Sequence, residues 1–586
     1  MFPQRGFLSA TGLLGLRPAA HPLVSVDMAV TPMHVERREQ IFPTLTEAQL
    51  QRISRYGTRR TVQDGEILFN QGDEGVHFFV VLRGALDVVQ PHAEGETLIV
   101  RHEPGNFTGE TAMLAGRRAL ATGRVRGDGE VVDIPPSALR NLVVADAELS
   151  EMLMRAFILR RVALINNHFG DAVVLGSRHC ARTQGIREFL ERNAHPYVYL
   201  DVEQDESARA LVERFQIGPQ DIPVLICRGT KVLRAPSNEE VAECLGFNAG
   251  IACSAVRDVV VIGAGPAGLS AAVYAASEGL DVLVLETNAP GGQAASSAKI
   301  ENYLGFPTGI SGGALAGRAF TQAQKFGAEI AIASKAARLD CSGSPYAIEL
   351  EGGHRISART VVIATGAEYR KLDLAELPRF ENMGVYYGAM FLDRKVLEGQ
   401  EVVVVGGGNS AGQAAVYLSG LAGHVHMLVR SGGLADSMSR YLIRRIEESP
   451  RITLRTRTEI VGLRGDSELE QVRWRNAATG ETEDRPVRAV FCMTGANPCT
   501  SWLDGCVALD DKGFVKTGQD LTPEDLASTS WPLSRPPLLL ETSRPGIFAV
   551  GDVRSGNIKR VASAVGEGSI SVQLVHRILA GISAGA

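Results

Sequence analysis

The sequence contains no Cys-x-x-Cys motif, and it has only eight cysteines in 586 residues. So few cysteines in so long a chain do not make a disulfide framework, and they are typical of proteins from a reducing compartment. We therefore expect a cytoplasmic protein. We interpret residues 1–40 as a disordered tail, or as the product of a start codon placed too early, with Met28 and Met33 as alternative starts, rather than as a signal peptide.

The sequence also lacks a strong charge of one sign, since its net charge is only −6. Nothing therefore suggests a surface that binds polyanions, and we expect no nucleic-acid partner. The longest apolar window, VVVIGAGPAGLSAAVYAA (259–276), contains glycine turns and a proline, so it predicts a strand, a turn and a helix rather than a membrane span. The twelve histidines do not cluster at metal-ligand spacing, so we expect no metal site. His424 and His426 alternate along a predicted strand, which indicates packing.

The length predicts several domains, and the texture of the sequence separates them. Residues 41–166 contain many short alternating strands followed by a long helix. Residues 170–246 alternate strands and helices, which predicts a small α/β domain. The region from 257 to the end contains two strand–glycine-turn–helix units, so it should hold two nucleotide-binding halves.

The first glycine turn lies in DVVVIGAGPAGLSAAVYAASEGLDVLVLE (258–286). Gly263, Gly265 and Gly268 let the backbone turn tightly and approach a pyrophosphate, and the following helix offers N–H groups and a partial positive charge. Glu286 closes the second strand, where it can accept hydrogen bonds from an adenosine ribose. This combination indicates an FAD site.

The second glycine turn lies in EVVVVGGGNSAGQAAVYLSGLAGHVHMLVRS (401–431), where the second strand ends in Arg430 instead of an acid. A guanidinium suits a 2′-phosphate, which a carboxylate would repel, so this turn predicts NADPH. A solvated surface charge is the alternative interpretation of Arg430. The residues assigned to NADPH are Gly406, Gly408, Asn409, Ser410, Ala411 and Arg430, with Arg440 and Arg444 as weaker candidates.

Region 257–586 resembles the low-molecular-weight thioredoxin reductases along its whole length. The matching pieces are PGGQ (290–293), IENYLGFP (300–307), TVVIATG (360–366), FCMTGANP (491–498) and GIFAVGDVRSGNIKRVASAVGEGS (546–569). The resemblance implies a homodimer of two-domain α/β flavoproteins, with an FAD-binding domain formed by 257–371 and 498–586 around an NADPH-binding domain, 372–497. It assigns to FAD the residues Gly263, Gly265, Gly268, Glu286, Gly292, Gln293, Asn302, Gly366, Gly551, Asp552 and Val561.

The resemblance fails at the reactive dithiol of that family. The matching stretch here is GAMF (388–391), so Gly388 and Phe391 stand where the family has two cysteines. A disulfide reductase needs a thiolate or a disulfide at this position, and neither residue supplies one. Phe391 would instead offer an apolar surface to the flavin.

The N-terminal domain (41–166) resembles the cyclic-nucleotide-binding β-roll, on the basis of HFFVVLRGALDVV and EPGNFTGETAMLAGRRALATGRV (103–125). The resemblance implies that Glu110 accepts a ribose 2′-OH and that Arg118 pairs with the cyclic phosphate of cAMP or cGMP. Arg117 competes with Arg118 for that role, and a purely structural or interaction role of the domain is the alternative. The residues assigned to the nucleotide are Gly109, Glu110, Arg118 and Ala119. No helix-turn-helix follows, which argues against DNA binding.

The middle domain (170–246) resembles a thioredoxin- or glutaredoxin-like fold. In GSRHCART (176–183) only Cys180 remains of the expected pair, with Ser177 in the first slot, and QDIPVLI (220–226) predicts a cis peptide bond at Pro223. The second cysteine of such folds is usually buried, so a redox role for Cys180 competes with vestigial packing or partner recognition. Elsewhere, Cys492 is predicted to lie in the core, and Cys499 and Cys506 are weak candidates for an external dithiol.

The leading hypothesis is an NADPH-dependent FAD oxidoreductase of the thioredoxin-reductase type with a cyclic-nucleotide-type regulatory domain. Hydride would pass from NADPH to the flavin, with hinges near residue 370 and at 495–500. The electrons would then leave for a small redox protein or a small-molecule acceptor. Two alternatives stay open: electron transfer like that of ferredoxin–NADP reductases, which also lack the dithiol, and a flavin- and nucleotide-binding redox sensor with little turnover.

Overall fold

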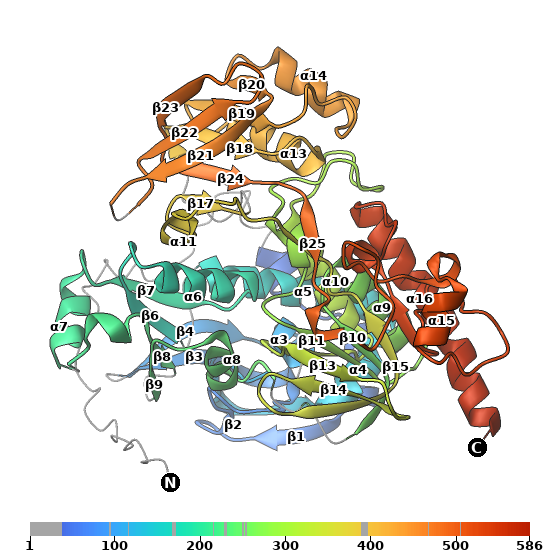
Figure 1. The fold of residues 1–586 in the computed structure, drawn as a ribbon. Helices are drawn as coiled ribbons and strands as arrows, with labels where there is room; N and C mark the ends of the chain where they lie inside the picture. Colours follow the sequence, from blue (N-terminus) through green and yellow to red (C-terminus); the bar gives the residue numbers. More distant parts are fainter. Residues whose placement is uncertain are drawn as a thin grey trace, which may run out of the picture. The chain divides into compact units, whose positions relative to one another are not determined.

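The computed structural model describes residues 38–92, 95–114, 117–166, 172–214, 216–227, 231–248, 251, 255–387, 397–466, 468–503 and 505–585 (Figure 1). Gly388, Phe391 and most of the predicted tail lie outside these residues. The chain divides into two units. The first is Met1–Ile251 with Gln324–Phe326, and the second is Ala252–Ala323 with Gly327–Ala586.

The first unit begins with an antiparallel roll. Its sheet has the order β1-β5-β3-β4, with β2 paired to β5. Phe78, Phe107 and Phe157 pack in its core with edge-to-face and tilted rings, and all three are fully buried. The elements are α2 (Glu47–Ile53), β1 (Thr58–Val62), β2 (Ile67–Phe69), β3 (Phe78–His92), β4 (Gly95–His102), α3 (Thr111–Leu114), β5 (Thr122–Ile134), α4 (Pro136–Ala145) and α5 (Ala147–Asn166). The predicted β-roll with a long helix after it is confirmed.

The first unit continues with a small four-stranded sheet of order β7-β6-β8-β9. β6 and β7 are parallel, as the helix between them requires, and the other pairs are antiparallel. The peptide bond Ile222–Pro223 is cis, as expected. The elements are β6 (Ala172–Gly176), α6 (Ala181–Arg192), β7 (Tyr197–Asp201), α7 (Glu206–Arg214), β8 (Val224–Cys227), β9 (Lys231–Arg234) and α8 (Asn238–Leu245). This strand order is that of the predicted thioredoxin-like fold.

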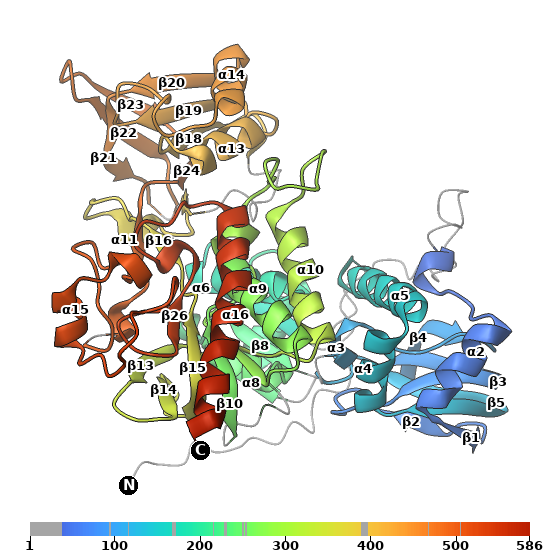
Figure 2. The ribbon, with the colours of Figure 1, turned by 90° about the vertical axis from the view of Figure 1, so that its right-hand side faces the viewer.

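The second unit contains a seven-stranded sheet of order β12-β11-β10-β15-β14-β13, with β26 paired to β15. The strands β10, β11, β12, β15 and β26 are parallel, and their valine-rich runs are buried on both faces. The elements are β10 (Val256–Ile262), α9 (Pro266–Ser277), β11 (Val282–Glu286), α10 (Gly312–Lys325), β12 (Glu329–Ile332), β13 (Ala336–Asp340), β14 (Tyr346–Leu350), β15 (Arg355–Ile363), β26 (Ile547–Ala549) and α16 (Val561–Gly585). Helix α16 runs alongside α9 (Figure 2).

The same unit contains a second parallel sheet, of order β17-β24-β18-β19-β20 (Figure 1). Its strands are β17 (Val385–Tyr386), β18 (Glu401–Val405), β19 (His424–Val429), β20 (Ile452–Thr456) and β24 (Ala489–Cys492), with the helices α13 (Asn409–Leu418) and α14 (Arg440–Glu448). An antiparallel sheet of β21 (Thr458–Arg464), β22 (Gln471–Asn476) and β23 (Thr482–Pro486) precedes β24. The segments expected to act as hinges form β16 (Ala367–Tyr369) and β25 (Ala496–Pro498), which pair with each other.

The cysteines depart from the expectation of a chain without disulfides. Cys227 is bonded to Cys244, which ties β8 to α8, and Cys341 is bonded to Cys506. The external dithiol suggested for Cys499 and Cys506 is therefore wrong, because Cys506 is buried with another partner. Sequence patterns could not show these pairs, since the partners come together only in the folded sheets. Among the described helices, none has the length and apolar character that spanning a membrane requires.

Candidate functional site

The first glycine turn forms a tight cradle at the start of α9. Gly263 has a φ of 104°, and a Cβ there would lie 2.4 Å from the carbonyl oxygen of Ala364. A Cβ at Gly268 would lie 1.9 Å from the carbonyl oxygen of Gly263, so helix and strand pack closely only without a side chain. Gly265 is different, because it is the N-cap of α9 and a Cβ there would meet nothing within 4 Å. Open space at a helix N-terminus is what a pyrophosphate needs.

The acid at the end of β11 is already fixed by the backbone of the turn. Glu286 accepts hydrogen bonds from the amides of Ala264 and Asn288, both at 2.8 Å, and it is almost fully buried. These two bonds hold the carboxylate beside the glycine turn. The residues present therefore fit the adenosine ribose expected at this position.

Other residues assigned to FAD come together around this cradle. A Cβ at Gly292 would lie 3.1 Å from the Cα of Gly265, so the PGGQ loop lies directly against the turn. Gln293 donates a hydrogen bond to the carbonyl oxygen of Ala367, 2.6 Å away. Val561 begins α16, so its amide lies at the N-terminus of a helix of 25 residues. Asn302, in the IENYLGFP segment, is exposed.

The Gly551–Asp552 pair is held by a polar network from α16. The amide of Gly551 donates to Glu567, and Arg554 donates to the same carboxylate. Burial raises the pKa of Asp552, the positive charge of Lys559 lowers it, and the negative charge of Glu567 raises it further. Gly366 has a φ of 66° and would face open space with a side chain. Gly551 has a φ of 74°, but a Cβ there would lie 2.9 Å from the Cβ of Ala267, so of these two glycines Gly366 is the one beside open space.

The second glycine turn repeats the geometry of the first. A Cβ at Gly406 would lie 2.3 Å from the carbonyl oxygen of Met493, whereas one at Gly408 would meet nothing within 4 Å. Gly408 is the N-cap of α13, as Gly265 is of α9. Asn409 accepts a hydrogen bond from the amide of Ser439, which ties the turn to the start of α14. Ala411 is fully buried in the position that Gly268 occupies in the first turn.

Arg430 is exposed at the end of β19, next to the second glycine turn. Arg457 contacts the two residues that follow Arg430: its amide donates to the carbonyl oxygen of Ser431, and its guanidinium is 3.8 Å from the Cβ position of Gly432. Sequence reasoning missed Arg457, because it follows β20 and carries no motif. Arg444, one of the weaker candidates, pairs with Glu448 on its own helix at 2.7 Å. Arg440, the other, is the exposed first residue of α14.

Side-chain contacts between the two halves of the second unit involve segments assigned to the cofactors. Arg445 of α14 pairs with Glu301 at 2.5 Å, in the IENYLGFP segment. The hydroxyl of Tyr369, on β16, is hydrogen-bonded to Ser410, and burial raises the pKa of this tyrosine. Ser410, assigned to NADPH from the sequence, is thus also a contact between the halves.

The free thiols described in the second unit are poorly suited to accept electrons. Burial raises the pKa of Cys492 to about 12 and that of Cys499 to about 11, with the negative charges of Glu381 and Glu368 adding to the effect. Cys492 is fully buried in β24, as predicted. Thiols of this kind are almost entirely protonated near neutral pH and are weak nucleophiles.

Cys180 lies at the N-cap of α6. It is half-buried. Burial raises the pKa of its thiol, but the amide groups of Thr183 and Arg182 and the charge of Arg182 outweigh that effect, and the pKa lies below the usual value. A helix N-terminus favours the thiolate for the same reason that it favours other anions.

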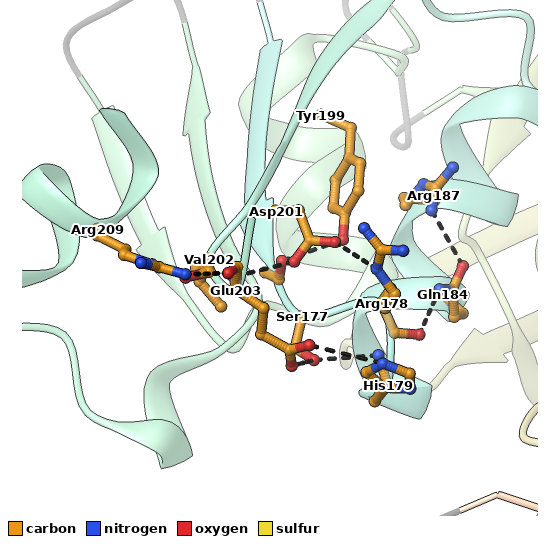
Figure 3. Close-up of polar contacts among 11 residues, drawn as sticks. Ser177, Arg178, His179, Gln184, Arg187, Tyr199, Asp201, Val202, Glu203 and Arg209 are labelled. Carbon is orange, nitrogen blue, oxygen red and sulfur yellow. Dashed lines mark hydrogen bonds and ion pairs between the residues drawn. The ribbon is translucent and has the colours of Figure 1, made fainter. Parts of the chain in front are cut away.

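The turn before Cys180 is fastened to the end of β7 by two acids (Figure 3). Arg178 pairs with Asp201 at 2.7 Å, while the hydroxyl of Ser177 donates to Glu203 and His179 lies 3.5 Å from the same carboxylate. The first slot of the lost pair is thus occupied by a hydroxyl that already has a partner.

The residues assigned to a cyclic nucleotide also have partners within the first unit. Both Nε and Nη2 of Arg118 lie 2.8 Å from Glu74. Glu110 pairs with Arg161 at 3.4 Å. The amide of Ala119 donates to the carbonyl oxygen of Asp73. Gly109 has a φ of 102°, and its carbonyl oxygen accepts a hydrogen bond from Arg160.

Comparison with known proteins identifies the family of the second unit. The family model described as "Pyridine nucleotide-disulphide oxidoreductase" matches residues 257–568. The chain belongs to this family. A model of the cyclic nucleotide-binding domain matches residues 59–146.

Three thioredoxin reductases are similar to part of this chain. The thioredoxin reductase of Bacillus subtilis (strain 168) is 33% identical over 322 residues, which cover 55% of this chain and 94% of the relative. NADPH-dependent thioredoxin reductase 3 of Arabidopsis thaliana is 29% identical over 368 residues, 60% of this chain and 65% of the relative. A solved thioredoxin reductase of Lactococcus lactis is 29% identical with a TM-score of 0.49, over 56% of this chain and 99% of that one.

Within the family the chain is thioredoxin reductase-like, and it is an NADPH-dependent flavoprotein oxidoreductase. FAD and NADPH are the cofactors that membership of the family implies. The two cradles at Gly265 and Gly408 fit these cofactors. The roles of individual residues stay predictions.

Proposed function

We propose that this protein transfers electrons from NADPH through FAD to an acceptor that does not receive them from a dithiol at residues 388–391. The pair of cradles carries the proposal. In each, the N-cap glycine of a helix faces open space after a buried parallel strand. When bound, NADPH supplies a hydride and FAD passes the electrons on.

The residues of this chain would bind and orient the two cofactors. The N-termini of α9 and α13 would each stabilise a pyrophosphate, and Glu286 would hold the ribose of FAD. Arg430, assisted by Arg457 from the end of β20, would select the 2′-phosphate of NADPH. The N-terminus of α16 at Val561 would stabilise negative charge on the reduced cofactor.

The electron exit differs from that of a dithiol reductase. Gly388 and Phe391 hold no sulfur, and the two free thiols described in the second unit have raised pKa values. We infer that the acceptor reaches the cofactor directly, as a small redox protein or a small molecule, in a homodimeric and cytoplasmic enzyme. Cys180, whose thiol pKa is lowered, is the remaining candidate for a relay inside the chain.

The roll would act as a regulatory domain for cAMP or cGMP. The match of residues 59–146 to the cyclic nucleotide-binding domain supports this. Glu110 would accept the ribose 2′-OH, and the phosphate would replace Glu74 at Arg118.

Stopped-flow mixing of the FAD-loaded enzyme with NADPH tests the proposal. We expect the flavin to be bleached within seconds, and we expect Arg430→Ala to raise the NADPH concentration for half-maximal rate about tenfold, since a charge-assisted pair to phosphate is lost. The NADH concentration for half-maximal rate should change much less, because NADH has no 2′-phosphate. Arg475→Ala is the matched control, because Arg475 is an arginine of the same half that pairs with Glu459 on the β21–β23 sheet.

Steady-state assays with ferredoxin, thioredoxin and quinones then sort the acceptors. Thioredoxin reduction that survives in a Cys180→Ser variant would show that a disulfide acceptor needs no thiol at that position. A flavin that NADPH does not bleach would contradict the enzyme proposal and favour a redox sensor.

A further inference from the structure

The roll and the thioredoxin-like domain meet at the residues assigned to the cyclic nucleotide. Arg161, on α5 of the roll, is almost fully buried. Its Nε donates to the carbonyl oxygen of Ala194 at 2.9 Å, and its Nη1 lies 3.4 Å from Glu110. One guanidinium therefore joins the ribose-binding acid to a backbone carbonyl of the neighbouring domain.

A second contact between the two domains covers Arg117 of the roll. The ring of Phe247 lies over the guanidinium of Arg117, with 4.8 Å between the guanidinium carbon and the ring centroid. Phe247 follows the C-cap of α8 and is nearly buried, packed against Phe189 and His195. The ring is thus fixed within its own domain and is not a loosely placed surface residue.

The preceding glycine leaves room for the phosphate-binding arginine. Gly246 has a φ of 68°, and a Cβ there would lie 2.8 Å from both Cδ and Nε of Arg118. The side chain of Arg118 therefore passes between Glu74 and the end of α8. A phosphate that draws Arg118 away from Glu74 must also change its packing against Gly246.

Helix α6 connects this contact to the thiol. Ala194 lies in the turn that closes the C-terminal end of α6, where its amide donates to Glu191 and that of His195 donates to Leu190. Cys180 is the N-cap at the other end. Helix α6 has 12 residues and is therefore about 18 Å long, so it connects Cys180 at one end with the Ala194 turn at the other.

We propose that the thioredoxin-like domain reads the occupancy of the cyclic-nucleotide site through two sets of contacts. In the first, Arg161 of α5 binds the carbonyl oxygen of Ala194 after α6. In the second, Arg117 and Arg118 contact the Gly246–Phe247 segment. A ligand hydroxyl that donates to Glu110 weakens the ion pair between Glu110 and Arg161. A ligand phosphate that pairs with Arg118 breaks the ion pair between Arg118 and Glu74. The ligand then has different affinities for two arrangements of these contacts, which is the condition for a ligand to shift them. The nucleotide part of this inference rests on the proposed function.

Hydrogen exchange measured by mass spectrometry on the full chain tests the coupling in two arms. In the first arm, saturating cAMP or cGMP should lower exchange around Gly109 and Arg118 and raise it at least threefold in peptides covering 190–195 and 243–247. In the second arm, no ligand is present and Glu110→Gln should raise exchange in 190–195 at least threefold, because Arg161 loses its charged partner.

Glu96→Gln is the matched control for the second arm. Glu96 pairs with Arg124 on the same roll, through another carboxylate–arginine contact at 2.5 Å, but neither residue contacts the thioredoxin-like domain through a described ion pair. Exchange in 190–195 should stay unchanged in this variant.

Calorimetry with cAMP and cGMP separates the two proposals. Heat of binding with unchanged exchange in 190–195 and 243–247, in both arms, would overturn the coupling and leave the nucleotide site standing. Absence of binding heat, together with a response to Glu110→Gln, would overturn the nucleotide as ligand while supporting the coupling. No response in either arm and no heat would overturn both.

Discussion

At the scale of single residues, His102 shows how burial sets a protonation state. It ends β4, is almost fully buried, and its ring is tilted against that of Phe42, with 6.0 Å between the ring centroids. Burial lowers its pKa to about 3, and the positive charge of Arg160 adds to the effect. The side chain of His102 is therefore neutral in the folded roll at every pH at which proteins are usually studied.

Acidification should destabilise the roll through His102. Between pH 6.5 and pH 3 the unfolded chain binds a proton at this histidine and the folded roll does not, so the free energy of unfolding falls as pH falls. From pH 7 to pH 5 the loss should be about 2 kcal/mol. Urea titration with pulse proteolysis, quantifying roll peptides by mass spectrometry, measures it.

The variant His102→Phe provides the control for this prediction. Phenylalanine keeps an apolar ring of similar size beside Phe42 but cannot bind a proton. In this variant the fall in the free energy of unfolding between pH 7 and pH 5 should be smaller by most of the expected amount of about 2 kcal/mol. An unchanged pH dependence would show that other groups cause it.

At the scale of elements, the two glycine turns allow fold and cofactor binding to be separated. Gly265 has a φ of −70° and Gly408 a φ of −90°, which alanine adopts without strain. A methyl group at either position would meet no atom within 4 Å. Gly265→Ala should therefore fold but retain little FAD, because the methyl group occupies the space of the pyrophosphate. The Gly408→Ala variant should keep its FAD, but NADPH should reduce that FAD much more slowly.

The ratio of flavin absorbance to protein absorbance and stopped-flow reduction measure these two losses. Gly317→Ala is the matched control, since Gly317 is an exposed glycine of α10 with no atom near its Cβ position. If Gly265→Ala keeps its full content of FAD, the cradle is not where the pyrophosphate binds.

Local elements of the site could be predicted from the sequence because they are contiguous. The strand, turn, helix and Glu286 of the first motif lie within thirty residues, and the cis bond at Pro223 belongs to a short local pattern. Contacts between distant residues could not be predicted. The Glu74–Arg118 pair and the contact of Arg457 with Ser431 and Gly432 depend on how separate strands pack, for which a single sequence carries no signal.

At the scale of the whole molecule, the Cys341–Cys506 bond ties together two segments of the FAD-binding half. It closes a loop with a sequence separation of 165 residues. Cross-linking so long a loop restricts the unfolded chain and typically stabilises a protein by about 2–5 kcal/mol. In a reducing compartment the two residues would be thiols, so the compartment decides whether this contribution is present.

Reduction should therefore lower the temperature at which the second unit releases its flavin. Flavin fluorescence during heating, with and without dithiothreitol, measures the effect, and a Cys341→Ser, Cys506→Ser double variant should melt like the reduced protein and ignore the reductant. A Cys227→Ser, Cys244→Ser variant, which alters the first unit, should keep the response. Equal release temperatures in all samples would contradict a stabilising role.

The pairing of β26 with β15 has a consequence for biosynthesis. Ile363 pairs with Ala549 at the end of a register that begins with Val361 and Ile547, so the sheet of the FAD-binding half takes up β26 only after the whole NADPH-binding half has been made. At a typical elongation rate of about 5–20 residues per second, the ribosome needs roughly ten to forty seconds for that stretch. During this interval the first unit and the NADPH-binding half can fold, whereas residues 361–363 of β15 wait for β26 at one edge. Acquisition of FAD is therefore expected to be among the last events in the maturation of the chain.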